Sequence, residues 1–388
     1  MGGAATNDSR RNALVANIGI GALGLLCLVA SVRMGPAWQW AHFLPNWGWS
    51  WSIQAKILLV LRVLVALVGA IVLVLLRPWL VRAIGTGRGH QTLVSALAAL
   101  LAVAAACAVT EGILHTRAWR SVQERWDQEP QRVANAEYGW AFKPDHAGTV
   151  ILNGHPVHYA TGPFGYRAPR PGVAPNFERP TIVFAGESII FGYGLDWPDT
   201  VPAQVEAMTG IQGANIAVNA HATDQILLRL RRELPRFGHP IAVVVPFMPR
   251  LFDRNLDQDR PHLDGQLRWH PAEPPPWRLL ELARRVVRYR SAAAIRDGTL
   301  MTQRALHSAI ALARARGAAP LVVVPQFLPE EPREAAIRRA VLDAAGIPYL
   351  LVPIKPEWIS PGHHHPTARG SLAIARAITA ALPPAAAG

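Results

Sequence analysis

Three long apolar runs fill the first third of the sequence and constrain the fold more than any other feature. They extend over residues 13–32, 57–76 and 93 to about 113. Each run is close to the roughly 20 residues that a helix needs to cross the hydrocarbon core of a bilayer. A helix in a soluble core seldom stays apolar on every face for that length, because one face usually meets water. The sequence therefore predicts three transmembrane helices.

Basic residues beside these runs predict how the helices are oriented. Arg10 and Arg11 precede the first run, and three further arginines lie between the second and third runs. Cytoplasmic segments carry an excess of lysine and arginine, so we expect the N-terminus and the second loop in the cytoplasm. No small-x-small cleavage site follows the first run, so we expect this run to remain as a helix. Three crossings then predict a multi-pass protein of a bacterial inner membrane, with its C-terminal domain in the periplasm.

The formal net charge of +13 does not by itself indicate a nucleic-acid partner. The excess comes mainly from scattered arginines, and the sequence has no compact basic run or nucleic-acid motif. Arginines beside the membrane helices favour lipid headgroups as partners instead. The two cysteines, Cys27 and Cys107, lie in predicted membrane helices, so they predict neither a disulfide framework nor a zinc site. We expect no metal and no cofactor, and the sequence predicts no oligomeric state.

Beyond the apolar runs, short apolar segments alternate with segments of helical pattern. The predicted strands are residues 181–185, 215–218, 241–247, 321–324 and 349–352. The predicted helices lie near residues 202–208, 224–234, 301–315, 332–345 and 367–381. Such alternation is typical of an α/β fold, in which helices cover both faces of a parallel sheet.

The sequence thus predicts three parts: a membrane anchor over residues 1–116, a helical stalk over 117–137 and an α/β domain over 138–388. An insertion at about 250–297 interrupts the alternation. Its aspartates do not have the spacing of an EF-hand loop, so we expect solvated loop charges there. Its basic amphipathic segment, 277–290, is of a kind that can lie on a membrane surface. Packing against its own domain is the favoured interpretation.

A serine follows the first predicted strand, in the sequence Gly186-Glu187-Ser188. Ligands usually bind at this edge of an α/β sheet, and a neighbouring glycine allows a sharp turn and a close approach. Near the C-terminus, three consecutive histidines, 363–365, precede the last predicted helix. Histidine is the usual base that activates a serine. Metal binding is the less favoured alternative, because adjacent histidines rarely point at one ion and no carboxylate or cysteine stands nearby.

Four ordered blocks over roughly residues 138–382 resemble the SGNH, or GDSL-type, family of esterases and acyltransferases. The block Gly186-Glu187-Ser188 corresponds to the family's GDS, with glutamate in place of aspartate. Residues 215–225 are close to the family pattern N-x-G-V-x-G-x-G-T-x-Q. The last block is His365-Pro366-Thr367, and residues 164–167, Phe-Gly-Tyr-Arg, resemble a GFR lead-in of bacterial members.

The resemblance implies a three-layer domain and the mechanism of a serine esterase. Ser188 would attack an ester carbonyl and form an acyl-enzyme. His365 would take the serine proton and return one to the leaving alcohol. The backbone N–H groups of Ser188 and Ala220 would bind the oxyanion, with Ala220 in place of a glycine.

The sequence departs from the family at two site positions. The family places an asparagine after the third strand, where this chain runs into Pro249 and Arg250. Arg250 and Asn255 are the candidates for the missing oxyanion donor. The family motif D-x-x-H would place an orienting acid at residue 362, which is Gly362. Glu357 or a backbone carbonyl near Ser360 is the candidate replacement.

Two classes of function follow from these features. The first is a membrane-anchored periplasmic serine esterase that acts on an acyl ester of an envelope lipid or glycan. An O-acyltransferase is a variant of it, in which another hydroxyl replaces water. The second is a catalytically degenerate protein of the same fold, which binds an acylated ligand or scaffolds an envelope assembly. A glycosidase is not predicted, because no pair of positioned carboxylates is found.

Overall fold

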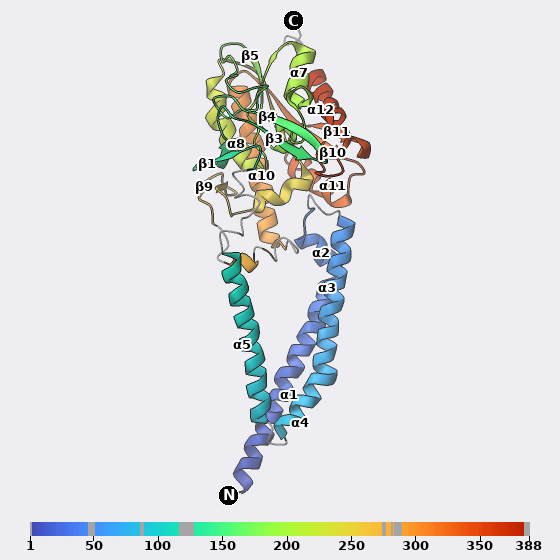
Figure 1. The fold of residues 1–388 in the computed structure, drawn as a ribbon. Coiled ribbons are helices and arrows are strands. Elements are labelled where there is room, and N and C mark those ends of the chain that lie inside the picture. The colour runs from blue at the N-terminus through green and yellow to red at the C-terminus, as the bar shows by residue number, and fades with distance from the viewer. Residues whose placement is uncertain are drawn as a thin grey trace. The chain divides into compact units, whose positions relative to one another are not determined.

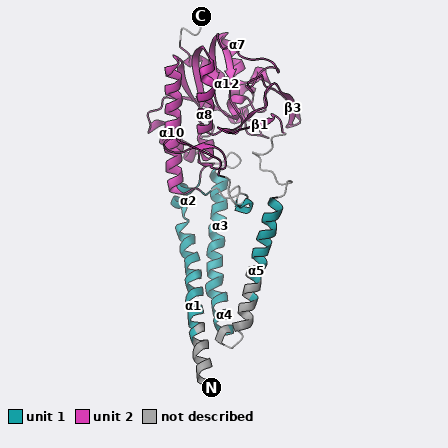
Figure 2. Ribbon diagram, turned by 90° about the vertical axis from the view of Figure 1, so that its left-hand side faces the viewer, with its two compact units in different colours: residues 1–43, 49–119, 275–289 teal, residues 44–48, 120–274, 290–388 magenta. Residues whose placement is uncertain are grey.

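The computed structural model describes residues 2–45, 51–85, 89–115, 128–273, 277–280, 282 and 289–383. The chain forms two compact units, shown in different colours in Figure 2. The first unit comprises residues 1–43, 49–119 and 275–289, and the second comprises 44–48, 120–274 and 290–388. Residues 117–127 of the expected stalk lie outside the described residues.

The first unit is helical (Figure 1). Its elements are α1 (Gly2–Arg33), α2 (Pro36–His42), α3 (Trp51–Ile71), the π-helical turn η1 (Val72–Leu76), α4 (Arg77–Gly85) and α5 (Gly89–Leu114). Among the described residues, Ala13–Arg33 and Trp51–Ala83 are long and apolar enough to cross a membrane. The described apolar part of α5, Leu101–Leu114, is shorter than a membrane span. A third membrane crossing therefore stays a prediction.

Helices α1 and α3 approach each other closely at two glycines. A Cβ atom on Gly69 would lie 2.9 Å from the carbonyl oxygen of Gly24 and 3.0 Å from Cβ of Cys27. Small residues allow such close packing between membrane helices. Arg62 of α3 donates from Nε to the carbonyl of Ser31 at 2.7 Å. Arg62 lies inside the second apolar run, residues 57–76. The contact gives its charge a polar partner, which a charge within an apolar helix requires.

The second unit contains the predicted parallel sheet. Its strand order is β11-β10-β7-β5-β6. All four neighbouring pairs in this sheet are parallel. The strands are β5 (Pro180–Phe184), β6 (Gln212–Asn215), β7 (His239–Pro246), β10 (Ala319–Phe327) and β11 (Leu350–Ile354). The predicted α/β fold is therefore confirmed.

Helices cover both faces of this sheet and make three layers (Figure 1). Alternate strand residues point to opposite faces, so Val183 and Val243 enter one core while Ile182 and Phe184 enter the other. The elements on the Val183 side are α8 (Thr223–Glu233), α10 (Ala292–Ala315), α11 (Pro332–Arg338) and the π-helical turn η6 (Arg339–Asp343). Those on the Phe184 side are α7 (Val201–Thr209) and α12 (Ala368–Ala381).

Two antiparallel hairpins precede the sheet. They are formed by β1 (Arg132–Asn135) with β2 (Gly139–Phe142), and by β3 (Ala147–Leu152) with β4 (His155–Ala160). Strand β1 occupies part of the segment that was expected to be a helical stalk. Arg167, from the lead-in block, ties the second hairpin to the loop after Ser188. Its guanidinium donates to the carbonyls of His158 at 2.8 Å and Leu195 at 3.2 Å.

The insertion contains the 3-10 helical segment η5 (Pro249–Leu256) and the short hairpin of β8 (His262–Leu263) and β9 (Trp269–His270). Helix α10 begins at Ala292, earlier than the sequence predicts. Most of the amphipathic segment 277–290 lies outside the described residues. The described residues 277–280 group with the helical unit, and the packing of the rest of this segment stays a prediction. The backbone N–H groups of Arg278 and Leu279 donate to the Glu111 carboxylate of α5.

Candidate active site

Ser188 is the first residue of the short helix α6 (Ser188–Phe191), and a three-residue turn separates it from the end of β5. Its side chain is almost buried, with 6% relative exposure. Gly186 is required in this turn, because a Cβ atom there would lie 2.8 Å from Cβ of Ile190 and 3.0 Å from Pro246. The serine therefore lies at the carboxyl edge of the sheet, in a turn that packing holds in place.

His365 meets Ser188 across this edge of the sheet. It lies in the loop before α12, and its Nε2 atom is 2.8 Å from Ser188 Oγ. The Nδ1 atom is 2.7 Å from the backbone carbonyl oxygen of His363. A carbonyl can only accept, so Nδ1 carries the ring hydrogen and Nε2 is left as the acceptor. The structure thus places the imidazole in the tautomer that can take a proton from the serine.

Burial also keeps this imidazole neutral. Desolvation lowers the pKa of His365 to about 3, against the opposing effect of the His363 carbonyl. Positive charge on Arg254 and on the neighbouring histidines lowers this pKa further. A neutral ring can act as a general base throughout the physiological pH range.

Glu187 is a second neighbour of the serine hydroxyl. Its Oε2 atom lies 2.6 Å from Ser188 Oγ and accepts from the backbone N–H of Ile189 at 3.1 Å. The hydroxyl has one hydrogen, which cannot serve both Glu187 and His365. Burial raises the pKa of Glu187 and favours its protonated form. A protonated Glu187 donates to Ser188 Oγ and leaves the serine hydrogen to His365.

Ala220 has a left-handed backbone, with φ +66°. Alanine rarely adopts this conformation, which explains why the family has a glycine at the corresponding position. The loop that carries Ala220 is tied to the serine turn, because the N–H of Val218 donates to the carbonyl of Gly186 at 3.0 Å. Among the described residues, no protein group accepts a hydrogen bond from the N–H of Ala220. This N–H remains a candidate oxyanion donor.

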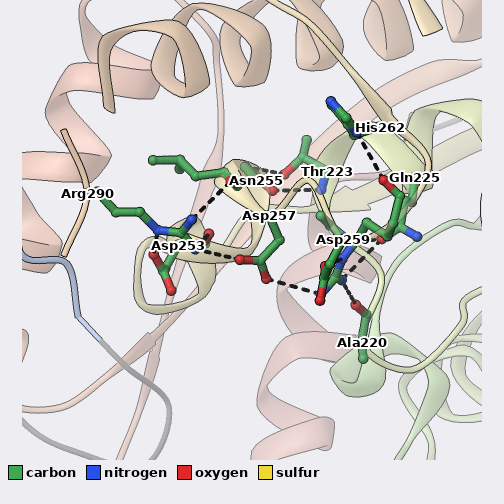
Figure 3. A network of polar contacts seen from close by, with 12 residues as sticks. Ala220, Thr223, Gln225, Asp253, Asn255, Asp257, Asp259, His262 and Arg290 are labelled. Atoms are coloured by element: carbon green, nitrogen blue, oxygen red, sulfur yellow. Dashed lines mark hydrogen bonds and ion pairs between the residues drawn. The ribbon is translucent and has the colours of Figure 1, made fainter. Parts of the chain in front are cut away.

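A network of ion pairs holds the carbonyl of Ala220 (Figure 3). Arg260 donates to that carbonyl at 3.0 Å and to Asp257 at 3.1 Å. Asp257 in turn lies 2.5 Å from Arg290, which also pairs with Asp253 at 2.7 Å. The expectation that these aspartates are solvated loop charges was therefore wrong, because arginines of the same domain neutralise them. The network fixes the turn that contains the candidate oxyanion donor.

The two candidates for the missing oxyanion donor have other partners in the structure. The Nε atom of Arg250 pairs with Glu334 at 2.6 Å. Both amide hydrogens of Asn255 are used, because Nδ2 donates to Thr223 Oγ1 at 3.0 Å and to Thr302 Oγ1 at 2.8 Å. The structure thus does not bring a side-chain donor from Asn255 to Ser188.

The expected position of the orienting acid is closed by a neighbouring side chain. A Cβ atom on Gly362 would overlap the amide of Asn153, which lies in the β3–β4 turn and donates to Ser360 Oγ at 2.9 Å. Glu357, the other candidate, is exposed on the 3-10 turn η7 (Pro356–Trp358). The carbonyl of His363 orients His365 in their place. A backbone carbonyl leaves no signature in a sequence, so this partner was not identified there.

The histidines near the C-terminus pack against each other and against a tyrosine ring. The rings of His363 and His365 are 5.3 Å apart, and Tyr193 packs 4.9 Å from the His365 ring. No group of three or more histidine, cysteine or acidic side chains within the described part of the chain is arranged to hold an ion.

Comparisons with known proteins give matches at the level of structure. No protein-family model matches the sequence, and no curated protein matches it. A lipolytic protein of the G-D-S-L family from Desulfitobacterium hafniense matches with a TM-score of 0.35 at 11% identity, over 52% of this chain and 99% of that one. A GDSL-like lipase from Bacteroides thetaiotaomicron matches with a TM-score of 0.32 at 17% identity, over 54% and 90% of the two chains.

An acetyl xylan esterase from Butyrivibrio proteoclasticus also matches, with a TM-score of 0.33 at 10% identity, over 53% of this chain and 64% of that one. These structures are of the GDSL and esterase class that the sequence blocks resemble. At such identities and TM-scores, the similarity alone assigns neither an activity nor a substrate. The proposal below therefore depends on the geometry around Ser188.

Proposed function

We propose that this chain is a serine esterase that hydrolyses an acyl ester through an acyl-enzyme on Ser188. The supporting observation is the 2.8 Å contact between Ser188 Oγ and His365 Nε2, made by the histidine tautomer that can accept a proton. A nucleophile, a base and a group that orients the base form the arrangement that activates a serine.

The reaction follows from this geometry. Ser188 Oγ attacks the ester carbonyl carbon while its proton moves to His365 Nε2. The carbonyl of His363 accepts from Nδ1 and stabilises the imidazolium, and the N–H groups of Ser188 and Ala220 bind the oxyanion. His365 then protonates the leaving alcohol. Water attacks the acyl-enzyme by the same route, which releases the acid and restores the serine.

Two features of the described site would slow this reaction: a backbone carbonyl orients His365, and Asn255 does not bring a donor to Ser188. A backbone carbonyl orients the histidine where an acid would do so, and losing that acid costs on the order of 10⁴ in rate in a serine triad. The absence of one oxyanion donor costs on the order of 10²–10³. We therefore expect a slow esterase. The same features favour the second candidate, a protein that binds an acylated ligand without turnover.

We also propose that the α/β domain acts in the periplasm on an acylated lipid or glycan of the envelope. Two apolar helices long enough to cross a membrane support the anchoring, and Arg10 and Arg11 support a cytoplasmic N-terminus. The periplasmic location also needs the predicted third crossing, by residues 93 to about 113, because two crossings alone would return the chain to the cytoplasm. An Arg170→Cys reporter in a chain without Cys27 and Cys107 tests this placement. Labelling by an impermeant maleimide in cells with a permeabilised outer membrane supports it, and labelling only after lysis overturns it.

Ester hydrolysis by the full-length protein in neutral detergent tests the activity. Short-chain phenyl esters are hydrolysed by the wild-type protein, and Ser188→Ala lowers kcat/KM at least about 10³-fold. His365→Ala causes a loss of similar size. Ser308→Ala and His155→Ala are matched controls outside the site and retain activity. Equal hydrolysis by the wild-type and Ser188→Ala proteins, or none by the folded wild type, overturns the proposal.

A further inference from the structure

Two arginines pack against Trp140, whose Nε1 donates to the carbonyl of Asn219, the residue before the candidate oxyanion donor Ala220, at 2.9 Å. The guanidinium carbon atoms of Arg132 and Arg260 each lie 5.4 Å from the ring of Trp140. Both arginines act on the same buried imidazole, His221, and lower its pKa, after the larger effect of its burial. The ring stabilises each guanidinium group, because the face of an aromatic ring attracts cations.

The charge of Arg132 acts on Tyr193, a residue that packs against His365. Arg132 begins strand β1 and is half-buried. Burial raises the pKa of Tyr193, and the charge of Arg132 opposes that rise. The ring of Tyr193 packs 4.9 Å from the ring of His365. Arg132 is thus joined to the oxyanion turn through Trp140, and its charge acts on the tyrosine that packs against His365.

The charges of the two arginines are balanced differently. Arg260 pairs with Asp257 at 3.1 Å and with Asp259 at 3.4 Å. For Arg132, no ion pair with a carboxylate is found among the described residues. Burial and the charge of Arg260 lower the pKa of Arg132 to about 10, so it keeps its proton at neutral pH. The carboxyl group next to Ser188, that of Glu187, is favoured in its neutral form by burial.

We propose that the ester substrate carries an anionic oxygen group, a phosphate or a carboxylate, on its alcohol part, and that Arg132 binds this group. The inference rests on the proposed function. His365 returns its proton to the leaving alcohol, so the alcohol lies on the His365 side of the site, where Tyr193 packs and the charge of Arg132 acts. A guanidinium binds a phosphate or carboxylate through two parallel hydrogen bonds, and desolvation strengthens them.

The test uses acetate esters of phenols that differ only in one meta substituent. The substituents are a carboxylate, a phosphate, a neutral carboxamide and a trimethylammonium group. The wild-type protein in neutral detergent is expected to prefer the anionic esters over the neutral one, and the cationic ester least. In Arg132→Gln, the ratio of kcat/KM for the anionic and neutral esters falls about tenfold or more, since a hydrogen bond to a charged group is lost. Arg132→Lys keeps part of the ratio, and the exposed Arg170→Gln keeps all of it.

A binding measurement separates this inference from the proposed function. Phenyl phosphate and benzoate, which need no turnover, are expected to raise the Tm of the wild-type protein and of Arg170→Gln but not of Arg132→Gln. The ligand that raises the Tm more shows whether the site prefers a phosphate or a carboxylate. Hydrolysis that depends on Ser188 but has equal ester ratios in wild type and Arg132→Gln overturns the inference alone. Absence of all hydrolysis overturns the proposed function, and the Tm shifts then decide the anion site.

Discussion

The imidazole of His365 is oriented by the backbone of His363, whose carbonyl oxygen lies 2.7 Å from Nδ1. A peptide carbonyl carries only a partial charge, so it fixes the ring tautomer but stabilises an imidazolium less than a carboxylate does. A single residue, His364, lies between the donor and the acceptor. The same loop therefore supplies the base and its orienting group, and the acid of the family motif has no counterpart at Gly362.

The space for that acid can be restored. Asn153→Gly removes the amide that overlaps a Cβ atom at position 362, and glycine suits the left-handed φ of 52° at residue 153. Adding Gly362→Asp then recreates the motif D-x-x-H. We expect kcat of the double variant to exceed that of Asn153→Gly alone by at least about tenfold, as an orienting acid contributes up to about 10⁴.

Glu357→Ala is the control for this experiment, because Glu357 is exposed and the orienting bond goes to His363. Its kcat is expected to remain within about twofold of wild type, since changes at exposed positions away from a site have small effects. A tenfold loss in Glu357→Ala, or no gain from Gly362→Asp in a folded double variant, contradicts the account of the orienting group.

The low pKa of His365 predicts the acid limb of the pH profile. The base must be neutral, and burial lowers its pKa to about 3 from an ordinary value of 6.5. We expect kcat/KM to persist from pH 6.5 down to about pH 4. The unfolded chain binds more protons than the folded one between these pKa values, so this group lowers the stability as the pH falls through that window. An acid limb centred near pH 6.5 contradicts the buried, neutral base.

Glu187→Gln tests the role of the neighbouring carboxyl group. The raised pKa of Glu187 favours a protonated form that donates to Ser188, and this form is lost as the pH rises through that pKa. The wild-type rate should then fall on the alkaline side, because an ionised Glu187 takes the serine hydrogen. A glutamine can donate at any pH, so the Glu187→Gln profile lacks this fall. Identical alkaline limbs in the two proteins exclude this role.

Ala220→Gly tests the strain in the oxyanion turn. The left-handed conformation of Ala220 costs alanine about 1–2 kcal/mol. Glycine removes this cost, but the larger entropy of glycine in the unfolded chain cancels part of the gain in stability. We expect a rise in Tm of about 1–3 °C with activity retained, because the donor is the backbone N–H. Ala217→Gly, at a buried position in the same loop without positive φ, should lower the Tm. A lower Tm for Ala220→Gly contradicts the strain.

The fold and the contact between Ser188 and His365 could be predicted from the sequence because both leave local patterns. Buried parallel strands appear as short apolar runs, and Ser188 and His365 stand in short motifs at strand and helix boundaries. Arg132 could not be found in this way, because it is one of four arginines in residues 117–137, and nothing in that stretch predicts its hairpin. The ion-pair network that holds the carbonyl of Ala220 could not be predicted for another reason. Arg260 and Arg290 lie far from Ala220 in the sequence, and only folding of the insertion brings the network to that carbonyl.

Mapping the site of a fluorophosphonate adduct tests the central claim most directly, because such a probe reacts only with an activated serine. The full-length protein in neutral detergent is labelled, digested and analysed by mass spectrometry. The account predicts one adduct, on Ser188, that is absent in Ser188→Ala, forms more slowly in His365→Ala and forms normally in Ser308→Ala. No adduct on the folded wild-type protein, or an equal adduct in Ser188→Ala, would contradict the assignment of Ser188 as the nucleophile.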